Sequence, residues 1–421
     1  MRVASNSIYE TSKYQLGKRT ENLSNSNIVV TTGKRINTLS DDPIGLTKVI
    51  NLKSSISNIN QLERNISTGR MWVEAGDGSL SGVKDLLVEA KVQAIAMRND
   101  TVNEIDRKNV AAYISGIIKQ TYQFANTQIN GRYIFSGTKT ETKPFVFDDV
   151  NNPTMVMYQG SNDPFKIKSG KDLLVTVGHD GESVFSEKSV MVDETNNMID
   201  FKEIWDGGEA LISAKIPNGN YTAQHLADIV QVAMRETSAQ NGQNIEYDVT
   251  YDEANRSFTI KDGAGSNSKL TQLQLLWENG DHAGNNIAAD MGFFHDNRAP
   301  ASKSYTGETG VQWGIFKTLF DLKNYLETDN VQGIEKTITK IEMHFEHINK
   351  EITDLGEKGV MLDTREQILN DFNITLTTNR SKYEDADMIK AISDLKSSEI
   401  AYQASLASSS KVMGMSLVDY I

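Results

Sequence analysis

The chain has 421 residues, 38% of them hydrophobic, which is enough for two or three domains with apolar cores. Its 43 Lys and Arg are outnumbered by 56 Asp and Glu, and the formal charge of -13 argues against nucleic acid partners and membrane insertion. The absence of cysteine excludes disulfides, thiolate metal sites and a cysteine nucleophile.

The N-terminal segment contains no recognisable signal peptide. Arg2 is followed by mostly polar residues rather than an apolar core segment, so we expect no Sec-type signal. No uncharged run approaches the roughly 18 to 20 residues that a bilayer-spanning helix needs. Composition leaves two interpretations open, a cytoplasmic protein or one exported by a route that reads a disordered N-terminus.

Proline positions divide the chain into three parts. Only Pro43 lies outside the middle of the sequence, and the other five prolines fall between residues 144 and 300. Because proline interrupts helices, both flanks can form long helices. The middle, about residues 141–305, is expected to differ.

Apolar residues recur every seven positions in both flanks. The N-terminal series includes Tyr9, Leu16, Leu23, Val30, Leu52, Ile59, Ile66, Val73, Leu80 and Leu87. The C-terminal series includes Ile334, Ile341, Ile348, Leu355, Leu362, Leu369, Leu376, Leu395 and Tyr402. A repeat of this length predicts helices that supercoil with a left hand and bury one narrow face. Gly356 and Gly359 predict a bend or a short break in the C-terminal series.

The segment 40–43, Ser-Asp-Asp-Pro, predicts the start of a helix. Asp42 supplies a side-chain acceptor for free helix N–H groups, and Pro43 suits the first helical position. Paired Asp residues also occur in metal sites and acid–base pairs, but no histidine or third carboxylate is nearby. We therefore interpret Asp42 and Pro43 as a helix cap.

The middle of the chain shows short strand-like runs separated by Asn, Asp and Gly. These runs are residues 155–158, 165–167, 173–177, 247–251 and 258–260. One helix is expected between about residues 223 and 237. The fold class is therefore mainly α with a β-rich insert: a long antiparallel helical bundle and coiled coil from both termini, with a mixed α+β outer domain inserted in the middle.

Catalytic and metal-binding patterns are weak. His344 and His347 have helical metal-ligand spacing, but the commoner interpretation is a solvated helix edge. Asp180 and Glu182 are polar enough for catalysis, but a tight turn between two strands needs the same residues. We therefore predict no catalytic residue, no metal ligand, no cofactor and no enzymatic activity.

Three blocks of sequence resemble the flagellin superfamily, and within it the branch of hook–filament junction proteins. The blocks are residues 32–36 with 40–45, residues 125–127 with 131–137 and 144–145, and residues 385–387 with 401–406 and 416–421. The second block favours the junction branch over filament flagellin. The apolar run at residues 28–30 departs from the more polar family pattern.

The resemblance implies a domain arrangement. Residues 1–45 and 380–421 would form a terminal coiled coil that is disordered in the monomer. Residues 46–140 and 306–379 would form the helical bundle core, and residues 141–305 the β-rich outer domain. The expected assembly residues are Leu16, Leu23, Val30, Leu395, Tyr402, Leu406, Met413, Leu417 and Ile421.

The resemblance also implies a function. The chain would be a structural subunit of the bacterial flagellum at the junction between hook and filament, assembling helically through its coiled-coil ends and serving as the adaptor on which flagellin polymerises. Its partners would be the preceding hook-associated junction protein, flagellin, neighbouring copies of itself and a flagellar export chaperone. The expected location is extracellular, reached by the flagellar type III secretion route without a cleaved signal peptide.

Three alternatives remain open from the sequence. The first is filament flagellin itself, which would share the terminal helices. The second is a coiled-coil adhesin or phage tail component, which would form a stable trimer in solution. The third is a hydrolase housed in the insert and using Asp180 and Glu182.

Overall fold

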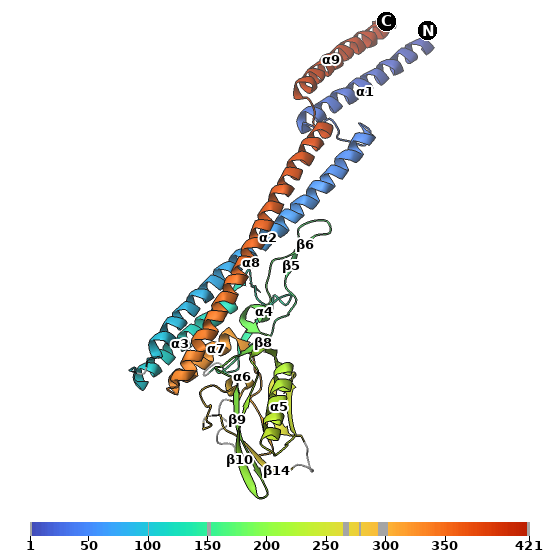
Figure 1. Cartoon of the computed structure of the whole chain (residues 1–421). Coiled ribbons are helices and arrows are strands. Elements are labelled where there is room, and N and C mark those ends of the chain that lie inside the picture. The colour runs from blue at the N-terminus through green and yellow to red at the C-terminus, as the bar shows by residue number, and fades with distance from the viewer. Residues whose placement is uncertain are drawn as a thin grey trace. The chain divides into compact units, whose positions relative to one another are not determined.

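The computed structural model describes residues 2–99, 101–149, 153–263, 269–277, 279–293 and 302–418, and the side chains of 7, 9–99 and 101–411 within them (Figure 1). The chain divides into two compact units. One comprises Met1–Ile66 with Asp363–Ile421, and the other comprises Ser67–Leu362. Each unit is described by itself below.

Helices dominate both flanks of the chain, as the sequence predicts. The helices of the flanks are α1 (Arg2–Thr32), α2 (Pro43–Met97), α3 (Glu104–Ala125), α7 (Ile315–Glu327), α8 (Val331–Glu384) and α9 (Met388–Val418). Three further helices lie in the middle of the chain: α4 (Gly181–Phe185), α5 (Ala223–Gln240) and α6 (Ala288–Met291). No helix in the described ranges is both long enough and apolar enough to cross a membrane.

The strands lie in the middle of the chain, so the predicted fold class of long helices with a β-rich insert is confirmed. They are β1 (Gln128–Ile129), β2 (Arg132–Tyr133), β3 (Phe145–Phe147), β4 (Val156–Tyr158), β5 (Lys166–Lys168), β6 (Leu174–Thr176), β7 (Ser186–Glu187), β8 (Ser189–Val192), β9 (Met198–Trp205), β10 (Gly208–Lys215), β11 (Gly219–Thr222), β12 (Tyr247–Asp252), β13 (Ser257–Asp262), β14 (Leu270–Leu275), β15 (Ser304–Thr306) and β16 (Trp313–Gly314).

In the unit Ser67–Leu362, α2 and α8 run antiparallel and share a heptad seam. A side chain at Gly76 would contact Leu355, and Lys91 forms an ion pair with Glu342 at 3.0 Å, so positions ascend on one helix as they descend on the other. The seam residues are nearly inaccessible: Leu80, Leu87, Ile341, Ile348 and Leu355 are each at most 1% exposed. The seven-residue repeat therefore marks the buried stripe of a helix pair.

The predicted bend at Gly356 and Gly359 is wrong, because α8 is continuous from Val331 to Glu384. A Cβ at Gly359 would lie 3.8 Å from Val73, so this glycine lies on the side of α8 that meets α2. Glycine costs an isolated helix about 1 kcal/mol. Burial of the flanking seam residues Leu355 and Leu362 outweighs that cost.

Two shorter helices add to this bundle. α3 and α7 pack together through apolar residues, which are Ile114, Ile117 and Ile118 of α3 and Leu319, Leu322 and Leu326 of α7. Asn103 caps α3 by accepting a hydrogen bond from the Asp106 N–H at 2.8 Å. Arg107 is buried, and its guanidinium binds the Met97 and Asn99 carbonyls and pairs with Asp329. The buried Arg107 side chain therefore holds the end of α2 against α3.

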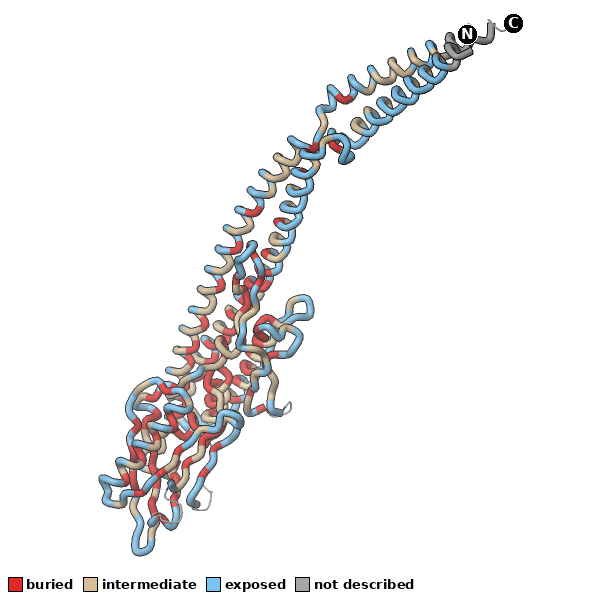
Figure 2. The backbone as a smooth tube through the Cα atoms, turned by 90° about the vertical axis from the view of Figure 1, so that its right-hand side faces the viewer, coloured by how far each residue is buried: buried red, intermediate tan, exposed pale blue. Residues whose placement is uncertain are grey.

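The β-rich insert has its own apolar core. Its larger sheets have the strand orders β10-β9-β14 and β12-β13-β15, and α5 packs against both β10 and β12. α5 contributes Leu226, Val230 and Met234 to the core, where they lie with Phe201 and Tyr247. Figure 2 shows buried residues concentrated in this region.

A polar network joins the insert to the helices of the same unit. Asp290 of α6 is buried and pairs with Lys340 of α8 at 2.5 Å, and its backbone carbonyl accepts a hydrogen bond from Trp313. His344 is also buried, between Thr318 at 2.7 Å and Glu187 at 3.1 Å. The interpretation of His344 as a solvated helix edge is therefore wrong, because the insert packs over that side of α8.

His347, one turn further along α8, is not a free helix edge either. Its Nε2 donates to the Ser183 carbonyl of α4 at 3.0 Å. Each histidine is thus bound to the insert, which explains the H-x-x-H spacing without a metal ion.

The core of the insert contains one carboxyl group with few polar contacts. Glu203 of β9 is 0% exposed, and its Oε1 accepts a hydrogen bond from the Tyr247 hydroxyl at 2.6 Å. Its other oxygen has no hydrogen-bond partner in the described part of the chain. Burial raises the pKa of Glu203 above its usual value, while side-chain hydrogen bonding to Tyr247 and Ser238 opposes that shift.

We expect the Glu203→Gln variant to gain stability over wild type as the pH rises. A raised folded-state pKa means that the wild type loses unfolding free energy once the pH passes the unfolded value of about 4.3. The amide does not ionise, so the difference should grow from about pH 4 to about pH 8, by about 1.4 kcal/mol per unit of raised pKa. Urea unfolding followed by tryptophan fluorescence at both pH values measures it.

Asp206→Asn, in the exposed β9–β10 turn, is the matched control and should show little pH-dependent difference. A Glu203→Gln gain of equal size at both pH values would contradict the interpretation.

Candidate assembly surface

The terminal helices α1 and α9 pair antiparallel within the unit Met1–Ile66 with Asp363–Ile421. Ser26 and Ser398 lie on the shared seam, with their hydroxyl oxygens 3.2 Å apart. The predicted stripe residues Leu16, Leu23, Val30, Leu395 and Tyr402 are all half-buried. The seam is therefore shallow, since two helices alone cover only part of each stripe.

The remaining predicted assembly residues, Leu406, Met413, Leu417 and Ile421, lie towards the C-terminal end of α9 and beyond it. Leu406 belongs to the same repeat but is 41% exposed. The side chains of Met413 and Leu417, and the whole of Ile421, lie outside the described residues. The half-buried seam thus extends through Tyr402, while Leu406 lies at its margin.

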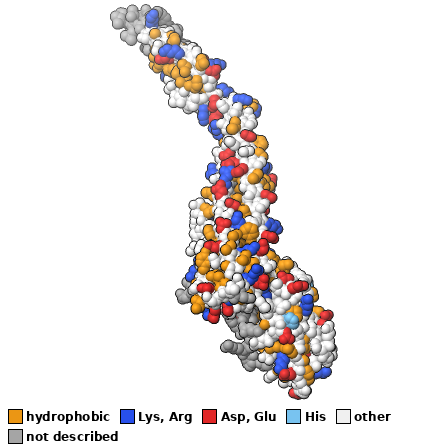
Figure 3. Space-filling view, turned by 60° about the vertical axis from the view of Figure 1, so that its left-hand side comes forward, with side chains coloured by type: hydrophobic (Ala, Val, Ile, Leu, Met, Phe, Trp, Pro, Cys, Tyr) orange, Lys and Arg blue, Asp and Glu red, His pale blue; other side chains and the backbone are white. Residues whose placement is uncertain are grey.

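A second apolar face of α9 points away from α1. Ile389, Ile392 and Ile400 are 85%, 55% and 58% exposed, and at 100° per residue they share the side of the helix opposite the seam residue Ser398. On α1, Tyr9, Tyr14 and Ile28 are also exposed. Figure 3 shows hydrophobic side chains gathered on the surface of these helices. The heptad analysis missed Ile389 and Ile400 because they lie off the main stripe; a search for a second stripe could have found them.

The chain between α1 and α2 is tied to the chain between α8 and α9. Gly33, with a φ of +66°, ends α1 and its carbonyl accepts from the Ala386 N–H at 2.9 Å. Arg35 N–H donates to the Glu384 carbonyl at 2.7 Å. Ile36 is buried between these segments. The two crossings therefore form one closed structure, which we call the clasp (residues 33–42 and 384–387).

The Ser-Asp-Asp-Pro segment forms the far side of the clasp. α2 begins at Pro43, and Asp42 accepts from the Gly45 N–H at 2.8 Å. Asp41 accepts from the N–H groups of Asn37 and Thr38. These backbone hydrogen bonds lower the pKa of both carboxyl groups. A Cβ at position 45 would lie 2.4 Å from the Asp42 carboxylate, which explains the glycine there.

Glu384 is the charged centre of the clasp. Its carboxylate is 4% exposed and contacts the ammonium groups of Lys34 and Lys53 at 2.8 and 2.7 Å, with Arg380 at 3.5 Å. Burial favours the neutral acid, but the hydrogen bonds from Lys34 and Lys53 hold the pKa of Glu384 below its usual value. Three elements, the α1–α2 segment, α2 and α8, thus meet at one carboxylate.

Comparison with known proteins shows partial similarity to flagellar proteins. A model of the bacterial flagellin N-terminal helical region matches residues 3–140. Flagellar hook-associated protein 3 of Escherichia coli (strain K12) is 31% identical over 159 residues, which cover 37% of this chain and 48% of that protein. Residues 3–140 of the chain are therefore similar to the N-terminal helical region of flagellins. The chain spans about half the length of this curated relative.

Longer but weaker matches also occur within the flagellin family. Polar flagellin F of Vibrio parahaemolyticus is 19% identical over 392 residues, or 93% of this chain and 90% of that protein. Among solved structures, the flagellar junction protein FlgL from Legionella pneumophila aligns with a TM-score of 0.46 and 18% identity, covering 80% of this chain and 99% of that one.

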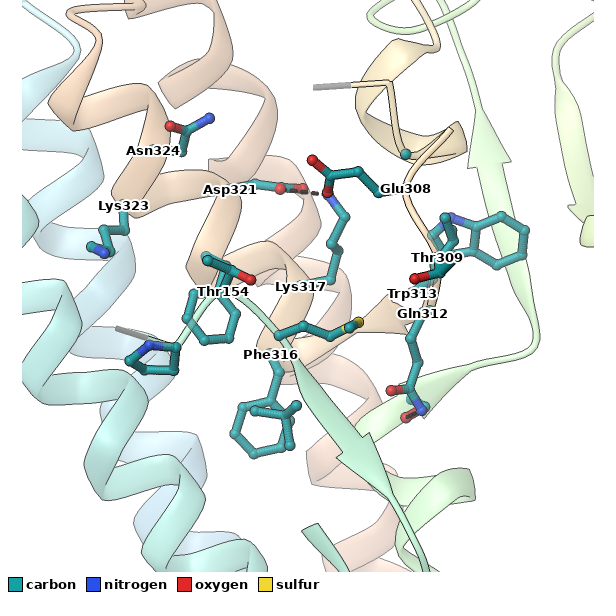
Figure 4. A pocket seen from close by; sticks show the side chains of 18 of the residues that line it. Thr154, Glu308, Thr309, Gln312, Trp313, Phe316, Lys317, Asp321, Lys323 and Asn324 are labelled. Atoms are coloured by element: carbon teal, nitrogen blue, oxygen red, sulfur yellow. Dashed lines mark hydrogen bonds and ion pairs between the residues drawn. The ribbon is translucent and has the colours of Figure 1, made fainter. Parts of the chain in front are cut away.

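The chain also contains a cavity of about 440 Å³ between α7 and the insert (Figure 4). Phe316, Lys317 and Asp321 of α7 line one side, and the loop that carries Glu308 and Gln312 lines the other. Lys317 and Asp321 form an ion pair at 2.5 Å. Burial lowers the pKa of Lys317 and raises that of Asp321, against their mutual attraction. Lys317 and Asp321 therefore bind each other within the cavity.

Asp180 and Glu182, the residues considered for a hydrolase, have different structural roles. Asp180 caps α4 by accepting from the Ser183 N–H at 2.7 Å, and Glu182 pairs with Arg256 at 3.4 Å. The predicted turn between two strands is wrong, because Asp180 and the residues after it begin a short helix. A side-chain oxygen that precedes a helix is used for capping.

A cluster that the sequence did not reveal lies next to Asp180. His179 contacts Glu351 at 3.0 Å and Asp354 at 3.3 Å, and these atoms are close enough together to hold a metal ion. The Lys358 ammonium already lies 2.5 Å from Asp354 and 3.3 Å from His179 Nε2. A metal ion would have to compete with this bound cation, so the geometry describes an ion-pair network between the insert and α8.

We expect Glu384→Gln to loosen the clasp at neutral pH. The lowered pKa of Glu384 means that its contribution to stability is present above the unfolded value of about 4.3 and is lost as the pH falls through the folded value. Loss of hydrogen bonds to a charged group should cost about 1.5–3 kcal/mol of local stability at about pH 7, and less in acid. Hydrogen exchange of the amides of Arg35 and Ala386 measures it.

Glu399→Gln is the matched control, because Glu399 pairs with Lys396 on an exposed face of α9. Unchanged exchange rates at Arg35 and Ala386 in Glu384→Gln would refute the role given to this carboxylate.

Proposed function

We propose that the chain is a structural subunit of the bacterial flagellum at the junction between hook and filament, and the adaptor on which flagellin polymerises. The observation that carries the proposal is the exposed apolar face of α9 beside a shallow α1–α9 seam. An isolated pair of amphipathic helices with half-covered stripes is marginal in water. Packing of further terminal helices from neighbouring copies would cover both stripes.

Helical assembly follows from the kind of contact these ends can make. The α1 and α9 surfaces differ from each other, so a copy that adds through one of them leaves the other available for the next copy. Such heterologous contacts generate rings or helical tubes. We infer that the chain acts by assembly rather than by catalysis, since Lys317 pairs with Asp321 in the cavity and Lys358 pairs with Asp354 in the His179 cluster.

The name of the Escherichia coli relative, flagellar hook-associated protein 3, supports a place at the hook rather than along the filament. On this proposal the partners are the preceding hook-associated junction protein beneath, flagellin above, and neighbouring copies around the axis. A flagellar export chaperone would cover the terminal apolar stripes before assembly. The insert, residues 141–305, would form the outer domain and stiffen or space the ring.

The proposed location is extracellular, reached through the flagellar type III secretion route without a cleaved signal peptide. A chain that is threaded through a narrow channel must be unfolded on the way. The absence of cysteine is compatible with that path, because no disulfide has to form or break.

Filament flagellin is the second candidate. The alignment with polar flagellin F of Vibrio parahaemolyticus over 93% of this chain favours it. Electron microscopy of the purified chain discriminates between the two, because a flagellin would polymerise alone into long filaments and a junction subunit would not.

Of the ends predicted to be disordered in the free monomer, residues 1–45 and 380–421, we expect disorder in the parts that form α1 and α9. Amides in residues 9–32 and 388–411 should then exchange close to intrinsic rates, because their stripes are only half covered. Amides beside the α2–α8 seam, such as those of Leu80 and Ile341, should exchange slowly. Hydrogen exchange on the purified full chain measures both sets, and protected ends would contradict the proposed disorder.

Leu406→Asp should block assembly while the unit Ser67–Leu362 stays folded. The new charge would be buried against neighbouring terminal helices in the assembly, where it lacks a partner. Cells that carry only this variant should export the chain but shed flagellin into the medium, with hooks that lack filaments in electron micrographs.

Ser408→Asp is the matched control, because it adds the same charge to the side of α9 away from Leu406 and should allow normal filaments. Normal filaments in Leu406→Asp cells would end the proposal that α9 is the assembly surface.

A further inference from the structure

The strand β10 forms one edge of the sheet β10-β9-β14 in the insert (Figure 1). It runs for eight residues, Gly208–Lys215, and β9 is the strand that pairs with it among the described residues. An edge strand carries a row of backbone N–H and C=O groups that can pair with another chain.

The register decides which groups of β10 point outward. Trp205 and Gly208 close a two-residue turn in which Gly207 has a φ of +104°, so these two residues form a hydrogen-bonded pair. Hydrogen-bonded and non-hydrogen-bonded pairs then alternate along an antiparallel ladder. The Ile216 N–H donates to the Asn197 carbonyl at 2.7 Å, and this is one of the positions at which the alternation predicts a hydrogen-bonded pair.

The backbone groups of four alternate residues therefore face away from β9: Glu209, Leu211, Ser213 and Lys215. In the described part of the chain, no backbone hydrogen bond outside the β9 ladder involves any of them. Asp200 of β9, which lies opposite Ser213, also follows this alternation. Its carbonyl points away from β10 and accepts a hydrogen bond from the Leu276 N–H on the β14 side.

Other long edges of the insert are covered. The outer side of β14 exchanges hydrogen bonds with Ser302, at 2.9 and 3.1 Å. On β12, the Val249 N–H donates to Gln231 of α5, and the Tyr247 carbonyl accepts from Arg235 of the same helix. β10 differs from both, since its outward groups lack such partners among the described residues.

The residues along this edge are complementary to themselves. If two β10 strands pair antiparallel through their outward groups, the register centred on Ile212 places Glu209 opposite Lys215 twice and Leu211 opposite Ser213 twice. Lys215 is exposed and has no ion-pair partner in the described ranges, whereas Glu209 contacts only the exposed Lys202, at 2.7 Å. Opposite charges on facing strands stabilise a pair.

We propose that β10 is a docking edge for the β10 strand of a second copy of this chain, so that two outer domains share one continuous sheet. On the inner face of the β10 sheet, Ile212 and Ala214 are already buried in the core beneath α5, so this face needs no rearrangement for pairing. On the outer face, Leu211 is 52% exposed and would be partly covered by the partner's strand.

This pairing is independent of the terminal helices. Two edge strands bury little area, so the contact between free molecules is weak and is favoured at high chain concentration. It links outer domains in pairs, in contrast to the heterologous contacts proposed for α1 and α9.

Charge reversal in the full chain tests the proposal, with Leu406→Asp as the background so that α9 does not contribute. Glu209→Lys and Lys215→Glu each place like charges opposite one another twice, and each should weaken dimerisation about tenfold in sedimentation velocity. The double variant restores opposite charges and should regain wild-type association. Asp248→Lys, which disrupts the exposed Asp248–Lys261 pair of β12 and β13, is the control and should change nothing.

Cysteine cross-linking tests the register, since the chain has no native cysteine. Hydrogen-bonded pairs place Cα atoms about 5.5 Å apart, which suits a disulfide. A mixture of Leu211→Cys and Ser213→Cys chains should form mixed disulfide dimers, and Leu211→Cys alone should form few.

Two outcomes would overturn the proposal. In the first, the double charge reversal fails to restore association, so that Glu209 and Lys215 act only as charges that keep the edge apart. In the second, the mixture yields no more disulfide than either single variant. Neither result bears on the proposed hook–filament function, which is tested separately by looking for filaments on cells that carry only the Leu406→Asp variant.

Discussion

The antiparallel seam between α2 and α8 is the contact on which the rest of the chain depends. Each helix has one narrow apolar stripe and is otherwise polar, so neither is stable without the other. Residues such as Leu80 and Ile341 are fully buried because the two stripes face each other over many turns. The same pairing brings distant parts of the sequence together and leaves the insert to begin and end beside the helices.

Buried charges determine how the insert packs on those helices. Asp290 with Lys340, and Glu187 with His344, connect segments far apart in sequence. Buried ion pairs contribute little net stability, because desolvation offsets their attraction. A wrong docking would leave each of these charges unpaired, so the network favours one orientation. A rigid outer domain is what the proposed ring subunit would require.

The surfaces that remain uncovered have a different character. The apolar face of α9 and the outward backbone of β10 are both incomplete in a single chain, one in hydrophobic contacts and the other in hydrogen bonds. The clasp around Glu384 connects the terminal helices to α2 and α8 through a few charged contacts, with little apolar burial. Terminal helices joined in this way can order late, when neighbouring copies supply the missing contacts.

The sequence by itself determined the long helices, their buried stripe, the start of α2 at Pro43 and the β-rich insert, because heptad spacing, capping residues and proline positions act locally. It also pointed to the terminal stripe, including Leu16, Leu23, Leu395 and Tyr402. Only the tertiary structure decided the burial of His344, the continuity of α8 through Gly356, the cluster at His179 and the exposure of Ile389. Each of these depends on a segment distant in sequence that packs, or does not pack, over the residue, and a one-dimensional pattern carries no information about that neighbour.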